Sequence, residues 1–216
     1  MDSAVIFDVD GVLLDLTPAE EDAFFLPFAQ RYGLTGLSRD WDSYRVRNDE
    51  HIIAEIIERH GLPPQDGEAL VADYLAILSS GAVPPRAIPG AAGLLKRLSG
   101  KRRLGIATAN LLSAARLRLL ASGLWAHVEA LAFGAEGSGH KRETVARAIA
   151  ASGLPRERIV YVGDNLNDVE AGLGNGVHFI GFSEDATRRQ RLAKAGAVHV
   201  AGDHARTADL IAALLT

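Results

Sequence analysis

Near its start the chain reads Ala4-Val5-Ile6-Phe7-Asp8-Val9-Asp10-Gly11, an apolar run that ends in two aspartates and a glycine. Alternate side chains of an extended segment point the same way, so Asp8 and Asp10 face one pocket if the apolar run is a strand. Gly11 permits the sharp turn that such a strand end requires. Taken alone, the pattern is explained equally well by an ordinary turn.

Four more short runs are rich in branched and aromatic residues and predict buried strands. Helical stretches separate most of them, and this alternation favours a parallel sheet covered by helices on both faces. We therefore expect an α/β fold with a doubly wound parallel sheet. The four runs are residues 104–107, 130–133, 159–162 and 177–182, with 198–200 as a candidate edge strand.

The interval between the first two predicted strands is much longer than one crossover helix needs, which predicts an insertion. Thr17-Pro18-Ala19-Glu20 has the capping-box pattern with proline at the first helical position, so a helix should begin just after Asp15. Two apolar helical stripes follow. The first consists of Ile52, Ile53, Ile56 and Ile57, and the second of Leu70, Tyr74, Ile77 and Leu78.

The stretch from Ser79 to Pro85 contains a glycine and two prolines and reads as a link back into the sheet. We expect residues 15–83 to form an inserted α-helical cap domain. Residues 1–14 and 84–216 would then form the core domain. The segments on either side of the cap, Asp15 to Thr17 and Ser79 to Pro85, are the expected hinges of a closing motion.

The composition limits the functions that are open to this chain. Hydrophobic residues make up 48% and charged residues 23% of its 216 residues, as in a soluble globular protein. A net charge of -4 argues against electrostatic binding to nucleic acid, and the absence of cysteine excludes disulfides, thiolate zinc sites and a cysteine nucleophile. With no export signal and no long apolar run, we expect a cytoplasmic monomer or weak homodimer without membrane contact.

A second acidic group, Gly163-Asp164-Asn165-Leu166-Asn167-Asp168, follows the predicted strand at 159–162. Asp164 and Asp168 are four residues apart, so they could share a face of the helix that should begin there. Their charges would be favoured by the helix dipole. Simple helix capping explains one of these carboxylates but not four converging ones.

Four carboxylates, those of Asp8, Asp10, Asp164 and Asp168, are thus expected where ligands bind to a doubly wound sheet, outside the carboxyl ends of its strands. Two like charges about 4 Å apart repel by about 4 kcal/mol at an effective dielectric constant of roughly 20. Such a cluster requires a divalent cation, and an all-oxygen ligand set favours Mg²⁺.

Thr108 and Lys141 are expected to complete the site. Thr108 follows the predicted strand at 104–107, where its hydroxyl could hold a phosphoryl oxygen, although most threonines at strand ends are structural. Lys141 opens a predicted helix after a glycine-rich loop, a position that the helix dipole disfavours for lysine. A negatively charged ligand would explain it, and a solvated lysine is the alternative.

Together these residues resemble the haloacid dehalogenase superfamily, whose phosphatases carry an Asp-x-Asp-Gly motif, a Thr or Ser, a Lys and a Gly-Asp-x-x-x-Asp motif. The resemblance covers essentially the whole chain, because the long helical insert is similar to the small cap domain of that superfamily. The matching residues occur in the same order, as Asp8-Val9-Asp10-Gly11, Thr108, Lys141 and Gly163-Asp164 to Asp168.

The resemblance implies Asp8 as a nucleophile that forms an aspartyl-phosphate, and Asp10 as the general acid and then the general base. It implies that Thr108 and Lys141 stabilise the transferring phosphoryl group, with Asn110 also within reach of the ligand. For the metal, it implies Asp8, the backbone carbonyl of Asp10 and Asp164 as ligands, with Asp168 close by.

The resemblance also implies a reaction class. Dehalogenases of the superfamily lack an aspartate at the position of Asp10, so a Mg²⁺-dependent phosphatase acting on a small phosphomonoester is expected. A sugar-phosphate mutase needs the same core, and Val12 is common to both branches. A phosphoryl-accepting receiver domain is the remaining alternative, but its phosphoacceptor lies on a middle strand and it has no cap.

The cap segment Tyr44-Arg45-Val46-Arg47-Asn48-Asp49 is similar to a segment that capped relatives often write with Gly-Arg-Thr-Asp. Arg47 is therefore the first candidate for binding an anionic group of the substrate, because a guanidinium matches carboxylate and phosphate geometry. Arg45 and Arg47 are equally well explained as surface residues before a helix. Substrate identity is not predicted; phosphoglycolate is a guess from the family alone.

Overall fold

The computed structural model describes all 216 residues. Its centre is a six-stranded sheet in the order β5-β4-β1-β6-β7-β8, in which every neighbouring pair is parallel. The fold class expected from the sequence is confirmed. The strands are β1 (Ala4–Phe7), β4 (Arg103–Ala107), β5 (Ala132–Phe133), β6 (Ile159–Gly163), β7 (His178–Phe182) and β8 (His199–Ala201).

The predicted strands are all present, and their ends lie within one residue of the prediction except at the start of β5. The run at 130–133 is a strand only in its last two residues, because Glu129–Leu131 forms a 3-10 turn. The edge strand begins at His199 rather than at 198. Sequence composition could not place these ends, since apolar residues also fill the turn that packs under β4.

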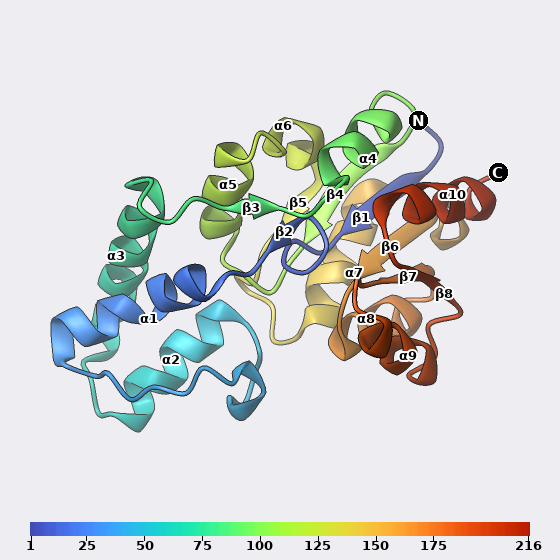
Figure 1. The fold of residues 1–216 in the computed structure, drawn as a ribbon. Helices are drawn as coiled ribbons and strands as arrows, with labels where there is room; N and C mark the ends of the chain where they lie inside the picture. Colours follow the sequence, from blue (N-terminus) through green and yellow to red (C-terminus); the bar gives the residue numbers. More distant parts are fainter.

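Helices cover both faces of the sheet (Figure 1). Val5 and Phe7 of β1 point into one apolar cluster with α4 (Ala91–Leu98), α5 (Leu112–Ala121) and α10 (His204–Leu214). Ala4 and Ile6 point into a second cluster on the other face, because successive residues of a strand face opposite ways. That second cluster packs against α7 (Lys141–Ser152), α8 (Leu166–Gly174) and α9 (Ala186–Lys194).

Three helices inserted between β1 and β4 pack around an apolar cluster of their own. They are α1 (Pro18–Tyr32), α2 (Asp49–Arg59) and α3 (Gly67–Ser79), and they lie beyond the carboxyl end of the sheet (Figure 1). The predicted capping box of α1 is formed, with Thr17 as its N-cap. All four isoleucines of the α2 stripe are buried, whereas Ile77 of the α3 stripe is only partly buried.

A two-stranded antiparallel ribbon lies where the chain passes between the sheet and the three inserted helices. It consists of β2 (Leu14–Asp15) and β3 (Arg86–Ala87). The division into a cap of residues 15–83 and a core made of the rest stays a prediction. The remaining short elements are α6 (Trp125–Val128) and 3-10 turns at Trp41–Ser43, Pro64–Asp66 and Arg156–Arg158. No helix combines the length and apolar character that crossing a bilayer requires.

Candidate active site

Asp8 follows the central strand β1, which pairs with β4 on one side and β6 on the other. Its backbone N–H continues the ladder by donating to the carbonyl of Val162 at 2.8 Å. Its side chain is almost fully buried, and Oδ1 accepts from the backbone N–H of Val9 at 2.7 Å. Lys141 Nζ lies 2.6 Å from the same oxygen. Asp8 is therefore held firmly through Oδ1, while its hydrogen bonds leave Oδ2 free.

Asp164 and Asp168 follow β6, the strand beside β1. The prediction that they share a helical face is wrong, because α8 begins only at Leu166 and Asn165 is its N-cap. Asp164 lies in the loop before the helix, and Asp168 is the third residue of the helix. Asp168 Oδ2 accepts from the backbone N–H groups of Asp164 at 3.1 Å and Asn165 at 3.2 Å. Helix capping thus accounts for Asp168, and it fixes the loop that carries Asp164.

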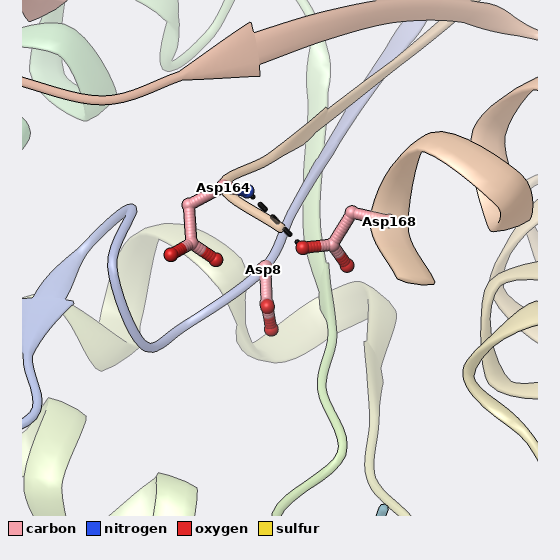
Figure 2. Close-up of side chains that lie close together, drawn as sticks. All are labelled: Asp8, Asp164 and Asp168. Atoms are coloured by element: carbon pink, nitrogen blue, oxygen red, sulfur yellow. Dashed lines mark hydrogen bonds between the residues drawn. The ribbon is translucent and has the colours of Figure 1, made fainter. Parts of the chain in front are cut away.

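The carboxylates of Asp8, Asp164 and Asp168 converge, with one oxygen of each within 4.8 Å of the others (Figure 2). Burial raises the pKa of Asp8 from 3.8 to about 7, Lys141 opposes this shift, and the charges of Asp168 and Asp10 add to it. Burial, together with the charges of Asp168, Asp8 and Asp10, raises the pKa of Asp164 well above its ordinary value. Ionised, this group of oxygens could hold a divalent cation, whose charge would offset the repulsion that adds to both pKa shifts.

Two glycines allow the carboxylates to come this close. Gly11 has a φ of 73°, and a Cβ there would lie 2.2 Å from Asp164 Oδ2. Gly163 precedes Asp164, and a Cβ there would lie 2.3 Å from the Cβ of Asp168. Side chains at either position would push the acidic groups apart. The glycine of the Asp-x-Asp-Gly motif is therefore required by its contact with the second acidic motif as well as by its backbone conformation.

Lys141 is the first residue of α7, as predicted, and its side chain is buried between carboxylates. Its Nζ lies 3.2 Å from Asp168 Oδ1, in addition to its contact with Asp8. Burial opposes the charged form, but the two carboxylates outweigh this effect and raise the pKa of Lys141. The carboxylates of Asp8 and Asp168 explain why a lysine occupies the N-terminus of α7. Tyr161 also donates its hydroxyl to Asp168 Oδ1 at 2.6 Å, so both oxygens of Asp168 are occupied.

Thr108 and Asn110 follow β4, on the other side of β1. Thr108 is buried, and its hydroxyl donates to Asn110 Oδ1 at 3.0 Å. The backbone N–H of Asn110 donates to the Thr108 hydroxyl oxygen at 3.2 Å. Both residues line the same cavity as Asp8 and Lys141. The carboxyl ends of the adjacent strands β4, β1 and β6 thus bring Thr108, Asp8 and Asp164 to one cavity, which Lys141 of α7 also reaches.

Asp10 also lines this cavity, but its side chain is bound by a residue that the sequence did not indicate. Arg118 of α5 lies with Nη2 2.6 Å from Asp10 Oδ1 and Nε 2.7 Å from Glu20 Oε1. Arg118 and Glu20 are both buried. One arginine among several on an ordinary helix gives no signal in a single sequence. The capping-box pattern indicates Glu20 only as a capping residue of α1.

The cavity has a volume of about 350 Å³ and lies between the strand ends and the inserted helices. Arg47 lines it, as predicted, and Nη1 of Arg47 lies 3.0 Å from Asp42 Oδ1. Arg45 instead pairs with Glu58 and Glu55 of α2 and is not part of the lining. Arg188 of α9 also lines the cavity, although no sequence pattern indicated it.

Three consecutive residues at the start of α2 bind two loops of the sheet domain. Asn48 Nδ2 donates to the carbonyl of Ser138 at 3.0 Å, and the backbone N–H of Gly137 donates to Glu50 Oε2 at 3.1 Å. Between them, Asp49 accepts from the backbone N–H of Leu111 at 2.9 Å. Asp49 is buried, which raises its pKa from 3.8 to about 7. These bonds hold the inserted helices over the cavity.

A model of the haloacid dehalogenase-like hydrolases matches residues 3–176. No curated protein matches the sequence. CbbY from Rhodobacter sphaeroides, solved with phosphate, has a TM-score of 0.77 and 24% identity over 95% of this chain and 96% of that one. A haloacid dehalogenase-like hydrolase from Streptococcus pneumoniae has a TM-score of 0.69 and 17% identity over 96% and 97%. A predicted phosphatase from Clostridium acetobutylicum has a TM-score of 0.72 and 17% identity over 99% of both chains. At such identities the similarity establishes the fold alone.

Proposed function

The chain belongs to the haloacid dehalogenase-like hydrolase family, and we propose that within this family it is a Mg²⁺-dependent phosphatase that hydrolyses a small phosphomonoester. The observation that supports this most is the buried pair of Asp8 and Lys141, 2.6 Å apart in a cavity that also contains Asp10 and Asp164. A nucleophile, a cation for the phosphoryl group and a second carboxylate for proton transfer are what the reaction requires.

In the first step Asp8 attacks the phosphorus atom through its free Oδ2. A bond forms between this oxygen and phosphorus as the bond from phosphorus to the ester oxygen breaks. Asp10, in its protonated form, gives its proton to the leaving oxygen, so an alcohol departs. Lys141 and the Thr108 hydroxyl bind oxygens of the phosphoryl group, whose negative charge they stabilise in the transition state.

In the second step water attacks the aspartyl-phosphate. Asp10, now a carboxylate, takes a proton from the water molecule as its oxygen bonds to phosphorus. The bond between phosphorus and Asp8 breaks, which releases inorganic phosphate and restores the Asp8 carboxylate. The docked helices α1 and α2 cover the cavity, and their opening would be needed to admit the substrate and release the alcohol.

We propose that Asp8, Asp164 and the backbone carbonyl of Asp10 would hold Mg²⁺, with Asp168 supporting the site from close range. Asp168 accepts three hydrogen bonds and makes one ion pair with Lys141, so both of its oxygens already have donors. This favours the supporting role. Bound Mg²⁺ would supply positive charge that offsets the repulsion between an anionic nucleophile and an anionic phosphate.

The deciding experiment is a panel of small phosphomonoesters assayed for phosphate release with and without Mg²⁺. Phosphoglycolate belongs in the panel, together with alkyl, aryl and sugar phosphates. Release that requires Mg²⁺ supports the proposal, and no release from any ester contradicts it. A phosphosugar that is converted to an isomer without free phosphate would identify a mutase instead. We also propose that the protein is cytoplasmic and that it is a monomer or a weak homodimer.

A further inference from the structure

Arg118 joins the half-buried carboxylate of Asp10 to the buried carboxylate of Glu20, which belongs to a different part of the fold. Its Nη2 lies 2.6 Å from Oδ1 of Asp10, in the loop after β1, and its Nε lies 2.7 Å from Oε1 of Glu20, in the first turn of α1. The side chains of Arg118 and Glu20 are 3% and 1% exposed, so water cannot replace either partner. The attraction between buried charges offsets the cost of removing them from water only when their geometry is good and their remaining polar atoms are hydrogen-bonded.

The two oxygens of Glu20 have different partners. Oε2 accepts from the backbone N–H and hydroxyl of Thr17, which closes the capping box of α1. Oε1 binds Arg118. The residue that caps the first inserted helix therefore also anchors the arginine that holds Asp10. The side-chain position of Asp10 is connected in this way to the position of α1.

The donors of Arg118 leave little for a substrate. Nε and Nη2 are used by Glu20 and Asp10, and Nη1 makes a long 3.4 Å contact with Asn110 Oδ1. Its single positive charge already lies between two carboxylates. Lys141 and Arg47, which also line the cavity, are better placed to bind substrate anions, because Lys141 contacts the proposed nucleophile Asp8 and Arg47 is more exposed than Arg118.

We propose that Arg118 is a positioning residue that holds Asp10 for proton transfer, and that Glu20 fixes Arg118 only while α1 is docked on the sheet domain. This inference rests on the proposed function, because it concerns the acid and base role of Asp10. Proton transfer to the leaving group would then be available only with the inserted helices in place. While α1 is not docked, the cavity would lack a correctly placed acid.

Two aryl phosphates of similar size test the proposal in the full-length protein. The nitro group of p-nitrophenyl phosphate makes its phenolate a good leaving group that needs little help from an acid, whereas phenyl phosphate needs the proton. In Arg118→Gln we expect kcat/KM for phenyl phosphate to fall about 100-fold, the scale of general acid catalysis, and that for p-nitrophenyl phosphate to fall less than about 3-fold. Glu20→Ala should give the same pattern with a smaller loss.

A second measurement follows from the base role of Asp10. With p-nitrophenyl phosphate, misplaced Asp10 slows the second step more than the first, so Arg118→Gln should release one equivalent of p-nitrophenol in a burst before slow turnover. The wild-type protein should show no comparable burst. Arg116→Gln is the matched control, since Arg116 is an exposed arginine on the same helix α5, and its kinetics should be unchanged.

Equal losses on both esters without a burst would overturn the proposal and leave Arg118 with a structural role. A rise in KM on both esters, with kcat preserved, would overturn it in favour of direct binding. If Arg118→Gln does not fold, the double variant Glu20→Gln/Arg118→Met removes both buried charges together and should give the same ester selectivity. A wild-type protein inactive on every phosphate ester would instead refute the proposed function.

Discussion

Asp49 offers the sharpest test of the electrostatics of this protein. It begins α2, lies outside the proposed metal site, and is buried with one hydrogen bond from the backbone N–H of Leu111. Substituting asparagine keeps the size of the side chain and an oxygen that accepts from Leu111. The only property removed is the ability to ionise. The difference in unfolding free energy between wild type and Asp49→Asn therefore reports the ionisation of Asp49.

The size of the effect follows from the pKa of Asp49, which burial raises from 3.8 to about 7. Between pH 4 and pH 7 the folded protein keeps the proton of Asp49, whereas the unfolded chain has lost it. The contribution of Asp49 to stability is therefore complete below pH 4. It falls by about 1.4 kcal/mol per pH unit from pH 4 to pH 7 and is lost once the pH rises through 7. The whole shift corresponds to about 4 kcal/mol, of which about 2 to 3 kcal/mol falls between pH 5 and pH 8.

Urea denaturation of both proteins at pH 5, 6, 7 and 8, with a chelator present, measures this difference. We expect the stability of wild type relative to Asp49→Asn to fall by about 2 to 3 kcal/mol from pH 5 to pH 8. The other titrating groups occur in both proteins and cancel. The control is Asp22→Asn, because Asp22 is an exposed carboxylate of α1 whose change should alter stability by less than about 0.5 kcal/mol. A difference for Asp49→Asn that is the same at all four pH values would refute the burial argument.

Three further predictions concern the acidic site. Asp8→Asn and Asp10→Asn should each reduce phosphate release from an aryl phosphate at least about 10³-fold with circular dichroism spectra like that of wild type, and normal activity of Asp8→Asn would remove the nucleophile from the mechanism. Adding Mg²⁺ to protein from which a chelator has removed divalent metal should raise the melting temperature, and Asp164→Asn should abolish most of that increase. An equal increase in the variant would exclude Asp164 as a ligand. Gly11→Ala should lower activity at least about 10-fold because its Cβ would lie 2.2 Å from Asp164 Oδ2. Gly33 also has a positive φ but no atom within 4 Å of an added Cβ, so Gly33→Ala should lose stability without that loss of activity.

The sequence was sufficient to predict that Asp8, Asp164 and Asp168 lie close together at the edge where Thr108 also follows a strand, because parallel strands end at one edge. The fourth expected carboxylate, Asp10, is not part of this group and is bound by Arg118 instead. Asp8, Thr108 and Asp164 follow β1, β4 and β6, which are adjacent in the sheet. The helical position of Asp164 was predicted wrongly, since Asn165 was available as a cap and delays α8. Spacing alone does not distinguish a residue in the first turn from one before it.

Side-chain contacts between segments that lie far apart in the sequence could not be predicted from one sequence. Arg118 lies 108 residues from Asp10, and Asp49 lies 62 residues from Leu111. Nothing in an ordinary helical stretch marks one arginine as buried, because burial depends on how α1 and α5 pack.

The antiparallel ribbon of β2 and β3 makes the inserted helices an exchangeable module. Leu14 pairs with Ala87 and Asp15 with Arg86, so the two ends of the insert are neighbours in space. A short hairpin turn could replace everything between them at a small cost in loop-closure entropy, and the β1 to β4 crossover would keep its geometry. Evolution can in the same way substitute one lid for another on an unchanged reaction centre. What such an exchange would discard here is the salt link from α1 to Arg118, so a grafted lid would have to provide its own acidic residue at that position.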